Sequence, residues 1–145
     1  MRTIGQSPYA VVDHIRRSYP SSQPAITRVK PTTLLKLEAA VVLVGTLFGY
    51  SHVGSSWWLF AALFLVPDLF MLGYLRNNKI GALVYNIGHT YLIPLPLALV
   101  SWTAQWDLST AIALIWTAHI AFDRLLGFGL KSERGFKHTH LDPSD

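Results

Sequence analysis

Five polar side chains suited to metal or proton chemistry occur inside long hydrophobic stretches of the sequence. Asn86 and His89 are three residues apart, and His119 and Asp123 are four residues apart. On a helix, each of these pairs shares one face. Asp68 stands in a third hydrophobic stretch. Because a charged side chain inside a membrane costs at least about 2.5–3.5 kcal/mol, such residues face a protein interior and find partners there. The pattern predicts a polar site buried among helices.

Two histidines and two carboxylates form a ligand set suited to zinc, iron or manganese. In this interpretation His89, His119 and Asp123 ligate a divalent metal. Asp68 is then a fourth ligand or a general base. An open coordination position would activate water or polarise a substrate. His140, in the segment after the last hydrophobic stretch, would complete the ligand set by folding back over the site. The alternative is an exposed tail whose histidines have no role.

Two further residues belong to the enzyme hypothesis. Asn86 would orient a ligand or substrate, and Arg124 would neutralise an anionic intermediate or hold Asp123 in place. Together with Asp68 these two are the expected catalytic residues. The polar residues all fall in the half of the hydrophobic stretches that is expected on the cytoplasmic side, so the site would open inward. The substrate would therefore be an amphiphilic or a cytoplasmic small molecule.

Two other interpretations of the same residues remain open from the sequence. In the first, the aspartates and histidines form a metal-free site that relays protons, as in a proton-linked transporter. In the second, they hydrogen-bond across helices and only stabilise the fold. Haem ligation through His89 and His119 is a minor variant of the cofactor hypothesis, because the helices would have to separate enough to admit a porphyrin.

The composition is typical of a membrane protein. Of 145 residues, 51% are hydrophobic and 14% are charged, against about 25% charged residues in a typical soluble domain. From Glu38 to Asp107 the charged residues are these two, Asp68, Arg76 and Lys79. There are no cysteines, which excludes disulfides, thiolate metal sites and covalent haem attachment. Outside the ends there is no basic face for nucleic acid, so the expected partner is a lipid bilayer.

Four hydrophobic stretches are each about 20 residues long, the length that a helix needs to cross a bilayer core of about 30 Å. We expect these spans at residues 33–52, 57–75, 80–100 and 108–130. The short connections favour antiparallel neighbours, so the expected fold is all-α, an up-down bundle of four transmembrane helices. Pro67 is expected to kink the second span, and Pro94 and Pro96 are expected to bend or end the third.

Lysine and arginine residues indicate the orientation of the spans. The chain has 12 of them, placed before or at the start of the first span, between the second and third, and at or beyond the end of the fourth. Positive residues stay on the cytoplasmic side, so both termini of a multi-pass plasma-membrane protein are predicted to be cytoplasmic. Trp57, Trp58, Trp102 and Trp106 would lie at the opposite interface, where an aromatic belt is expected.

The chain is expected to divide into three parts. Residues 1–32 form a basic cytoplasmic segment, residues 33–130 the four-helix transmembrane domain, and residues 131–145 a cytoplasmic tail. Within the first span, Gly45 and Gly49 are four residues apart. Small residues at this spacing allow close helix approach, which serves either a homodimer or packing within one bundle.

Two long runs of the sequence resemble a known family. They are PDLFMLGYLRNNKIGALVYNIGHTYLIPL at residues 67–95 and HIAFDRLLGFGLKSERGFKHTHL at residues 119–141. On these runs, residues 33–142 resemble a family of small four-span bacterial and fungal membrane proteins classed as a domain of unknown function. The resemblance implies a four-span membrane protein and no established activity. It places seven residues in the family pattern: Asp68, Asn86, His89, His119, Asp123, Arg124 and His140. Family members continue Thr-His-Leu with Gly, whereas this chain has Asp142.

Overall fold

The computed structural model describes residues 30–132, and this part of the chain is helical without β-strands. Its elements are α2 (Pro31–Val53), α3 (Trp57–Leu63), the 3-10 helix η1 (Val66–Leu75), α4 (Asn78–Gly88), α5 (Pro94–Thr103) and α6 (Asp107–Leu126). The all-α class expected from the sequence is confirmed for the described residues. His140 and most of the two terminal segments lie outside them.

Two of the four expected spans are single helices, and two are broken. α2 and α6 correspond to the first and fourth spans. The second span divides into α3 and η1, and Pro67, which has no N–H to donate, lies at the start of η1. The third span ends as α4 at Gly88 and resumes as α5 at Pro94. The breaks predicted from the prolines are therefore present, and a regular bundle of four straight helices is not.

Local capping groups explain where the helices begin and end. The Ser56 side chain accepts a hydrogen bond from the backbone N–H of Trp58 at the start of α3, and Asn77 does the same for Ile80 at the start of α4. These caps satisfy backbone donors that have no partner inside the helix. Gly127 ends α6 in the left-handed conformation, with φ of 100°, which glycine adopts without a steric cost.

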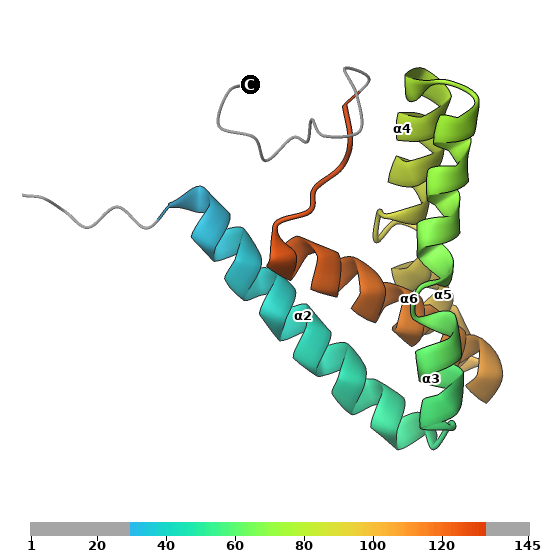
Figure 1. The fold of residues 1–145 in the computed structure, drawn as a ribbon. Coiled ribbons are helices and arrows are strands. Elements are labelled where there is room, and N and C mark those ends of the chain that lie inside the picture. Colours follow the sequence, from blue (N-terminus) through green and yellow to red (C-terminus); the bar gives the residue numbers. More distant parts are fainter. Residues whose placement is uncertain (1–29, 133–145) are drawn as a thin grey trace, which may run out of the picture.

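Helix α6 is central to the arrangement. It packs against α2, α5 and α3, whereas η1 and α4 pack mainly against each other. Figure 1 shows η1 and α4 as a hairpin that projects away from the long helix α2. Because α6 also contacts η1, the C-terminal half of α6 faces the hairpin across the region where the second and third spans break.

The hydrophobic core lies beside the N-terminal half of α6. Tyr50, Ala111 and Ile115 are almost fully buried there, and side chains of α2 and α3 surround them. The Tyr50 hydroxyl donates a hydrogen bond of 2.7 Å to the backbone carbonyl of Ser56. The core therefore joins α2, α3 and α6, and the buried Tyr50 hydroxyl has a hydrogen-bond partner within it.

Glycines allow η1 and α4 to approach closely. A Cβ atom at Gly81 would meet the ring of Tyr74, and one at Gly88 would meet the ring of Phe70. Helices come this close only where one side chain is absent. The hairpin that carries two of the candidate site residues therefore depends on these two glycines.

Two segments are long and apolar enough to cross a membrane, Pro31–Val53 and Trp57–Leu75. Only 11% and 6% of their most apolar windows are buried inside the fold. A core helix of a soluble protein would be mostly buried, so this exposure of apolar surface favours contact with lipid.

The two glycines of the first span have different surroundings. The space beside Gly45 is open, whereas a Cβ atom at Gly49 would contact the Leu114 side chain of α6 at 3.6 Å. Gly49 thus serves packing within the chain. A homodimer through Gly45 and Gly49 stays a prediction.

Candidate metal centre

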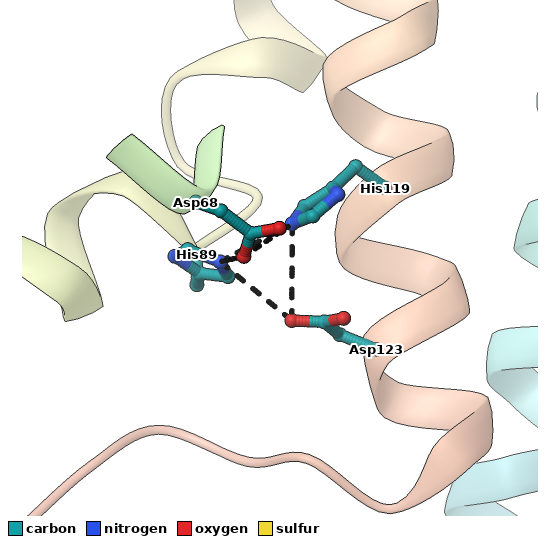
Figure 2. A group of neighbouring side chains, drawn as sticks. All are labelled: Asp68, His89, His119 and Asp123. Carbon is teal, nitrogen blue, oxygen red and sulfur yellow. Dashed lines mark hydrogen bonds and ion pairs between the residues drawn. The ribbon is translucent and has the colours of Figure 1, made fainter. Parts of the chain in front are cut away.

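Four side chains from three elements meet at one point of the fold. Asp68 lies in the first turn of η1, and His89 directly follows the last residue of α4. His119 and Asp123 lie one turn apart on α6. Figure 2 shows the four side chains turned toward a common centre. Residues up to 55 positions apart in the chain thus form one cluster, as the sequence predicted, and the described part of the chain brings together every expected ligand that it contains.

The distances within the cluster are too long for good hydrogen bonds. The Nε2 atoms of His89 and His119 are 3.3 Å apart. Asp68 Oδ1 lies 3.7 Å from His89 Nε2 and 3.6 Å from His119 Nε2. Asp123 Oδ2 lies 3.6 Å and 3.8 Å from the same two atoms. Hydrogen bonds between such groups measure about 2.7–3.2 Å, so the four groups face one another without bonding closely.

The same distances fit ligands around a shared ion. Ligands at about 2.0–2.2 Å from a tetrahedral zinc ion lie roughly 3.3–3.6 Å from one another. Five of the six distances among the four ligand atoms are 3.3–3.8 Å, and all lie within 4.8 Å. Two carboxylates and two neutral imidazoles also carry the charge that cancels a divalent cation. The donor set and its spacing therefore fit one divalent metal ion.

The exposed side of the cluster is its carboxylate side. His89 and His119 are 3% and 2% exposed, whereas Asp123 is 16% and Asp68 is 35% exposed. Both carboxylates line a pocket of about 290 Å³, together with Met71, Tyr85, Phe128 and Lys131. A water molecule or a substrate oxygen would reach the cluster from this pocket, past the carboxylates and opposite the buried imidazoles.

Hydrogen bonding orients His89 for ligation through Nε2. Its Nδ1 lies 3.0 Å from the backbone carbonyl of Tyr85, which can only accept, so the proton belongs on Nδ1. The Nε2 lone pair then points into the cluster, the arrangement typical of metal-binding histidines. The Tyr85 ring stacks on the imidazole at 3.8 Å, and its hydroxyl donates to Asp123 Oδ2 at 3.4 Å. Tyr85 therefore positions two of the candidate ligands.

His119 is oriented by packing. Its Nδ1 is buried and has no hydrogen-bond partner within residues 30–132. The imidazole meets the ring of Phe64 at 5.4 Å in an edge-to-face arrangement. Phe64 also packs against the apolar core. The Nε2 atom, which faces the other cluster residues, is therefore on the polar side of the His119 ring.

Side chains of α6 satisfy the carbonyls left open where α4 ends. Trp116 Nε1 donates to the Gly88 carbonyl at 2.6 Å, and Arg124 donates to the His89 carbonyl at 3.4 Å. The last carbonyls of a helix lack partners within it, and a cation near them is favourable. Arg124 lines a second pocket, with Glu38 and Tyr91, whose lining includes neither Asp68 nor Asp123. The structure thus gives Arg124 a contact that braces His89.

Asn86 does not join the cluster. Its side-chain amide donates to the Lys131 carbonyl at 2.9 Å and accepts from the Lys131 N–H at 2.7 Å. This pair of bonds ties α4 to the segment that follows α6. Asn86 therefore fixes the backbone at the edge of the pocket, and its predicted role in orienting a ligand or substrate stays a prediction.

Sequence reasoning missed Trp116 and Lys131 as parts of this region and assigned no role to Tyr85. A signal existed for Tyr85, which precedes His89 by four residues and therefore shares its helix face. Trp116 and Lys131 gave no signal, because an isolated tryptophan and a lysine after a span are common in membrane proteins.

The geometry does not favour haem. Both Asp68 and Asp123 place an oxygen within 3.8 Å of each imidazole Nε2. A porphyrin ligated by both histidines would have to lie between them, where these carboxylates are.

The described residues thus form an all-α fold with apolar helices and a cluster of two buried histidines and two partly exposed aspartates. The chain belongs to the family described as Domain of unknown function (DUF4260), which matches residues 32–143. The resemblance drawn from the sequence over residues 33–142 is confirmed. No curated protein matches the chain, and no solved structure does.

Proposed function

We propose that the protein is an integral membrane metalloenzyme in which Asp68, His89, His119 and Asp123 hold one divalent metal ion. The single observation that carries this proposal is the spacing of the four ligand atoms, 3.3–3.8 Å in the five measured pairs. Zinc, iron and manganese all accept this donor set, and the spacing of the five measured pairs is close to that expected between ligands of one zinc ion.

The chemistry follows from the open carboxylate side. A divalent ion held there would act as a Lewis acid on water or on a substrate oxygen, which would bind as a fifth ligand or in place of one carboxylate. Asp68 is the most exposed of the four residues, so it would be the ligand that leaves the ion and then accepts a proton from water in the pocket. The two buried imidazoles would offer Nε2 to the ion, and the Tyr85 hydroxyl makes a long hydrogen bond of 3.4 Å to Asp123. A hydrolytic reaction on a substrate that enters the pocket fits these roles best.

The membrane part of the proposal is a four-span chain with both termini in the cytoplasm. The two long apolar segments, the exposed apolar side chains along α2 and η1, and the distribution of lysine and arginine support it. Broken helices occur in membranes where they line a polar site, and the interrupted second and third spans both do so here.

The chain's lack of cysteine makes the topology directly testable. Ser55→Cys, in the connection between α2 and α3, should react with a membrane-impermeant maleimide added to intact cells. Asn78→Cys, at the start of α4, should react only after the membrane is opened. The four-span topology is wrong if both sites label equally from outside.

The metal is tested by elemental analysis of the full-length protein, purified in mild detergent without a histidine tag. We expect about one equivalent of metal per chain, or uptake of one equivalent of zinc by chelator-treated protein. His119→Ala and His89→Ala should lose it together. His52→Ala is the matched control, because His52 is exposed at the end of α2 and bonds to Phe48 of its own helix.

The same samples separate the other interpretations. A folded wild-type protein that contains no metal and does not bind added zinc would overturn the metalloenzyme proposal. In that case a proton relay predicts pH-dependent behaviour without metal, and a hydrogen-bonded network predicts only lower stability in the variants. A Soret band in the absorbance spectrum would point to haem instead.

A further inference from the structure

The pocket beside the metal centre has a cation on its wall. Lys131 lines it together with the carboxylates of Asp68 and Asp123. The Lys131 ammonium lies 5.4 Å from the centre of the Tyr85 ring and 5.8 Å from that of Phe128, within the range of cation–π contacts. The charge thus sits on an aromatic surface at the same opening through which a substrate would reach the ion.

Asn86 fixes the backbone that carries this lysine. Its amide both donates to and accepts from the backbone of Lys131, across 45 residues of sequence. A side-chain amide can do both, whereas a carboxylate can only accept. Gly127 ends α6 with a positive φ. The chain that follows reaches Lys131, whose backbone lies beside the Asn86 side chain. The position of the cation is therefore set by a specific pair of hydrogen bonds.

The charge of the pocket depends on the metal. Among the described lining residues, the charged groups are two carboxylates and one ammonium, a set that disfavours anions. A divalent ion would balance the two carboxylates and leave the ammonium of Lys131 beside it on the described wall. An anion would then be attracted both by the ion and by the lysine, which is a common partner of phosphate groups.

The remaining lining is apolar. Met71 and Phe128 complete the pocket, and η1, which supplies Met71, exposes Leu69 and Leu72 on its surface. A hydrocarbon chain could extend from the pocket along these side chains into lipid. A free anion without a hydrocarbon chain would make no contact with these apolar side chains.

On the basis of the proposed metal site, we propose that the pocket binds an amphiphile with an anionic, phosphate-type headgroup. The Lys131 ammonium pairs with the headgroup beside the metal, and Met71 and Phe128 contact the start of its hydrocarbon chain. Asn86 is a positioning residue, because it acts through the backbone of Lys131.

The test uses the full-length, zinc-loaded protein in dodecyl maltoside micelles, titrated with dodecyl phosphate in a calorimeter. Lys131→Gln should weaken binding by about tenfold or more, the effect of losing a charge-assisted bond. Lys131→Arg should bind within a few-fold of wild type. Lys79→Gln is the matched control, because it removes the same charge from an exposed site on α4. Equal binding by wild type and Lys131→Gln would overturn the proposal.

Two further arms identify the ligand and its dependence on metal. Inorganic phosphate should bind at least tenfold more weakly than dodecyl phosphate, and equal affinity would show that the ligand is a free anion and no amphiphile. Chelator-treated protein should lose affinity for dodecyl phosphate. Metal analysis precedes each titration, so failure to bind zinc counts against the metalloenzyme proposal, whereas zinc-loaded protein without phosphate binding counts only against this one.

The positioning role of Asn86 needs a separate measurement. Asn86→Ala should retain one equivalent of zinc and lose affinity for dodecyl phosphate, and the double variant with Lys131→Gln should be no weaker than Lys131→Gln alone. Asn78→Ala, an exposed amide on the same helix, is the control. Additive losses, or loss of zinc in Asn86→Ala, would show that Asn86 acts independently of Lys131.

Discussion

The two halves of α6 face very different surroundings. Beside the N-terminal half, polar groups have close partners: Tyr50 donates to the Ser56 carbonyl at 2.7 Å, and the hydroxyls of Ser101 and Ser109 are 2.7 Å apart. Beside the C-terminal half, the nearest atoms of the four-residue cluster are 3.3–3.8 Å apart. One helix thus supports both a core with short hydrogen bonds and a polar cluster whose members are more widely spaced from one another.

This difference in spacing indicates a different role for each half of α6. Burying polar groups without short hydrogen bonds is costly, and the N-terminal half shows that this fold can provide such bonds. The wider spacing of the cluster supports the proposal that the four residues share one ion. We therefore infer that the first half stabilises the fold and the second half holds an ion.

Removing the ion should have the largest effect on stability. At a free zinc concentration about a thousand times the dissociation constant, binding stabilises the folded state by about 4 kcal/mol. Chelator should therefore lower the unfolding temperature of the wild type and leave that of His119→Ala unchanged. Thermal unfolding in detergent, with and without chelator, measures this. An equal response of both proteins would contradict the site.

Damage to the core should produce the opposite pattern. Ile115 is almost fully buried, and Ile115→Ala removes packing atoms at a cost of about 2–3 kcal/mol. We expect a lower unfolding temperature with one equivalent of zinc retained. If Ile115→Ala lost zinc as completely as His119→Ala, the two halves would not be independent.

The hairpin of η1 and α4 connects stability to the site. Gly81→Ala places a methyl group against the Tyr74 ring, and overpacking of this kind costs about 1–3 kcal/mol. Since Asp68 and His89 come from this hairpin, weaker zinc binding should accompany the loss. Gly45→Ala is the control, because the space beside Gly45 is open, and it should be neutral or slightly stabilising in a helix.

The smallest effect should come from the support of one ligand. Tyr85→Phe removes the hydroxyl that donates to Asp123 at 3.4 Å and keeps the ring on His89. Loss of such a supporting bond costs about tenfold in metal affinity, measurable by competition with a chelator of known affinity. Tyr91→Phe removes a hydroxyl that has no partner within residues 30–132 and should leave the affinity unchanged.

The sequence by itself determined the helical class and the apolar segments, and it named the polar residues from which a cluster could form. The apolar runs and the prolines locate the segments and the breaks, since backbone preferences are local. Asp68, His89, His119 and Asp123 were predictable as a group because isolated polar groups in apolar helices must turn to one another. His140 lies beyond the described residues, and its role stays a prediction.

Only the tertiary structure decided which polar residues lie in the cluster and which support it. The sequence predicts Asn86 and Arg124 as catalytic groups, and the structure adds that Asn86 binds the backbone of Lys131 and Arg124 the carbonyl of His89. Their partners depend on how α4 breaks and how the chain leaves α6 at Gly127. Residue type limits what a side chain can bind, but the path of the backbone determines which group it reaches, and that path depends on contacts between segments far apart in the sequence.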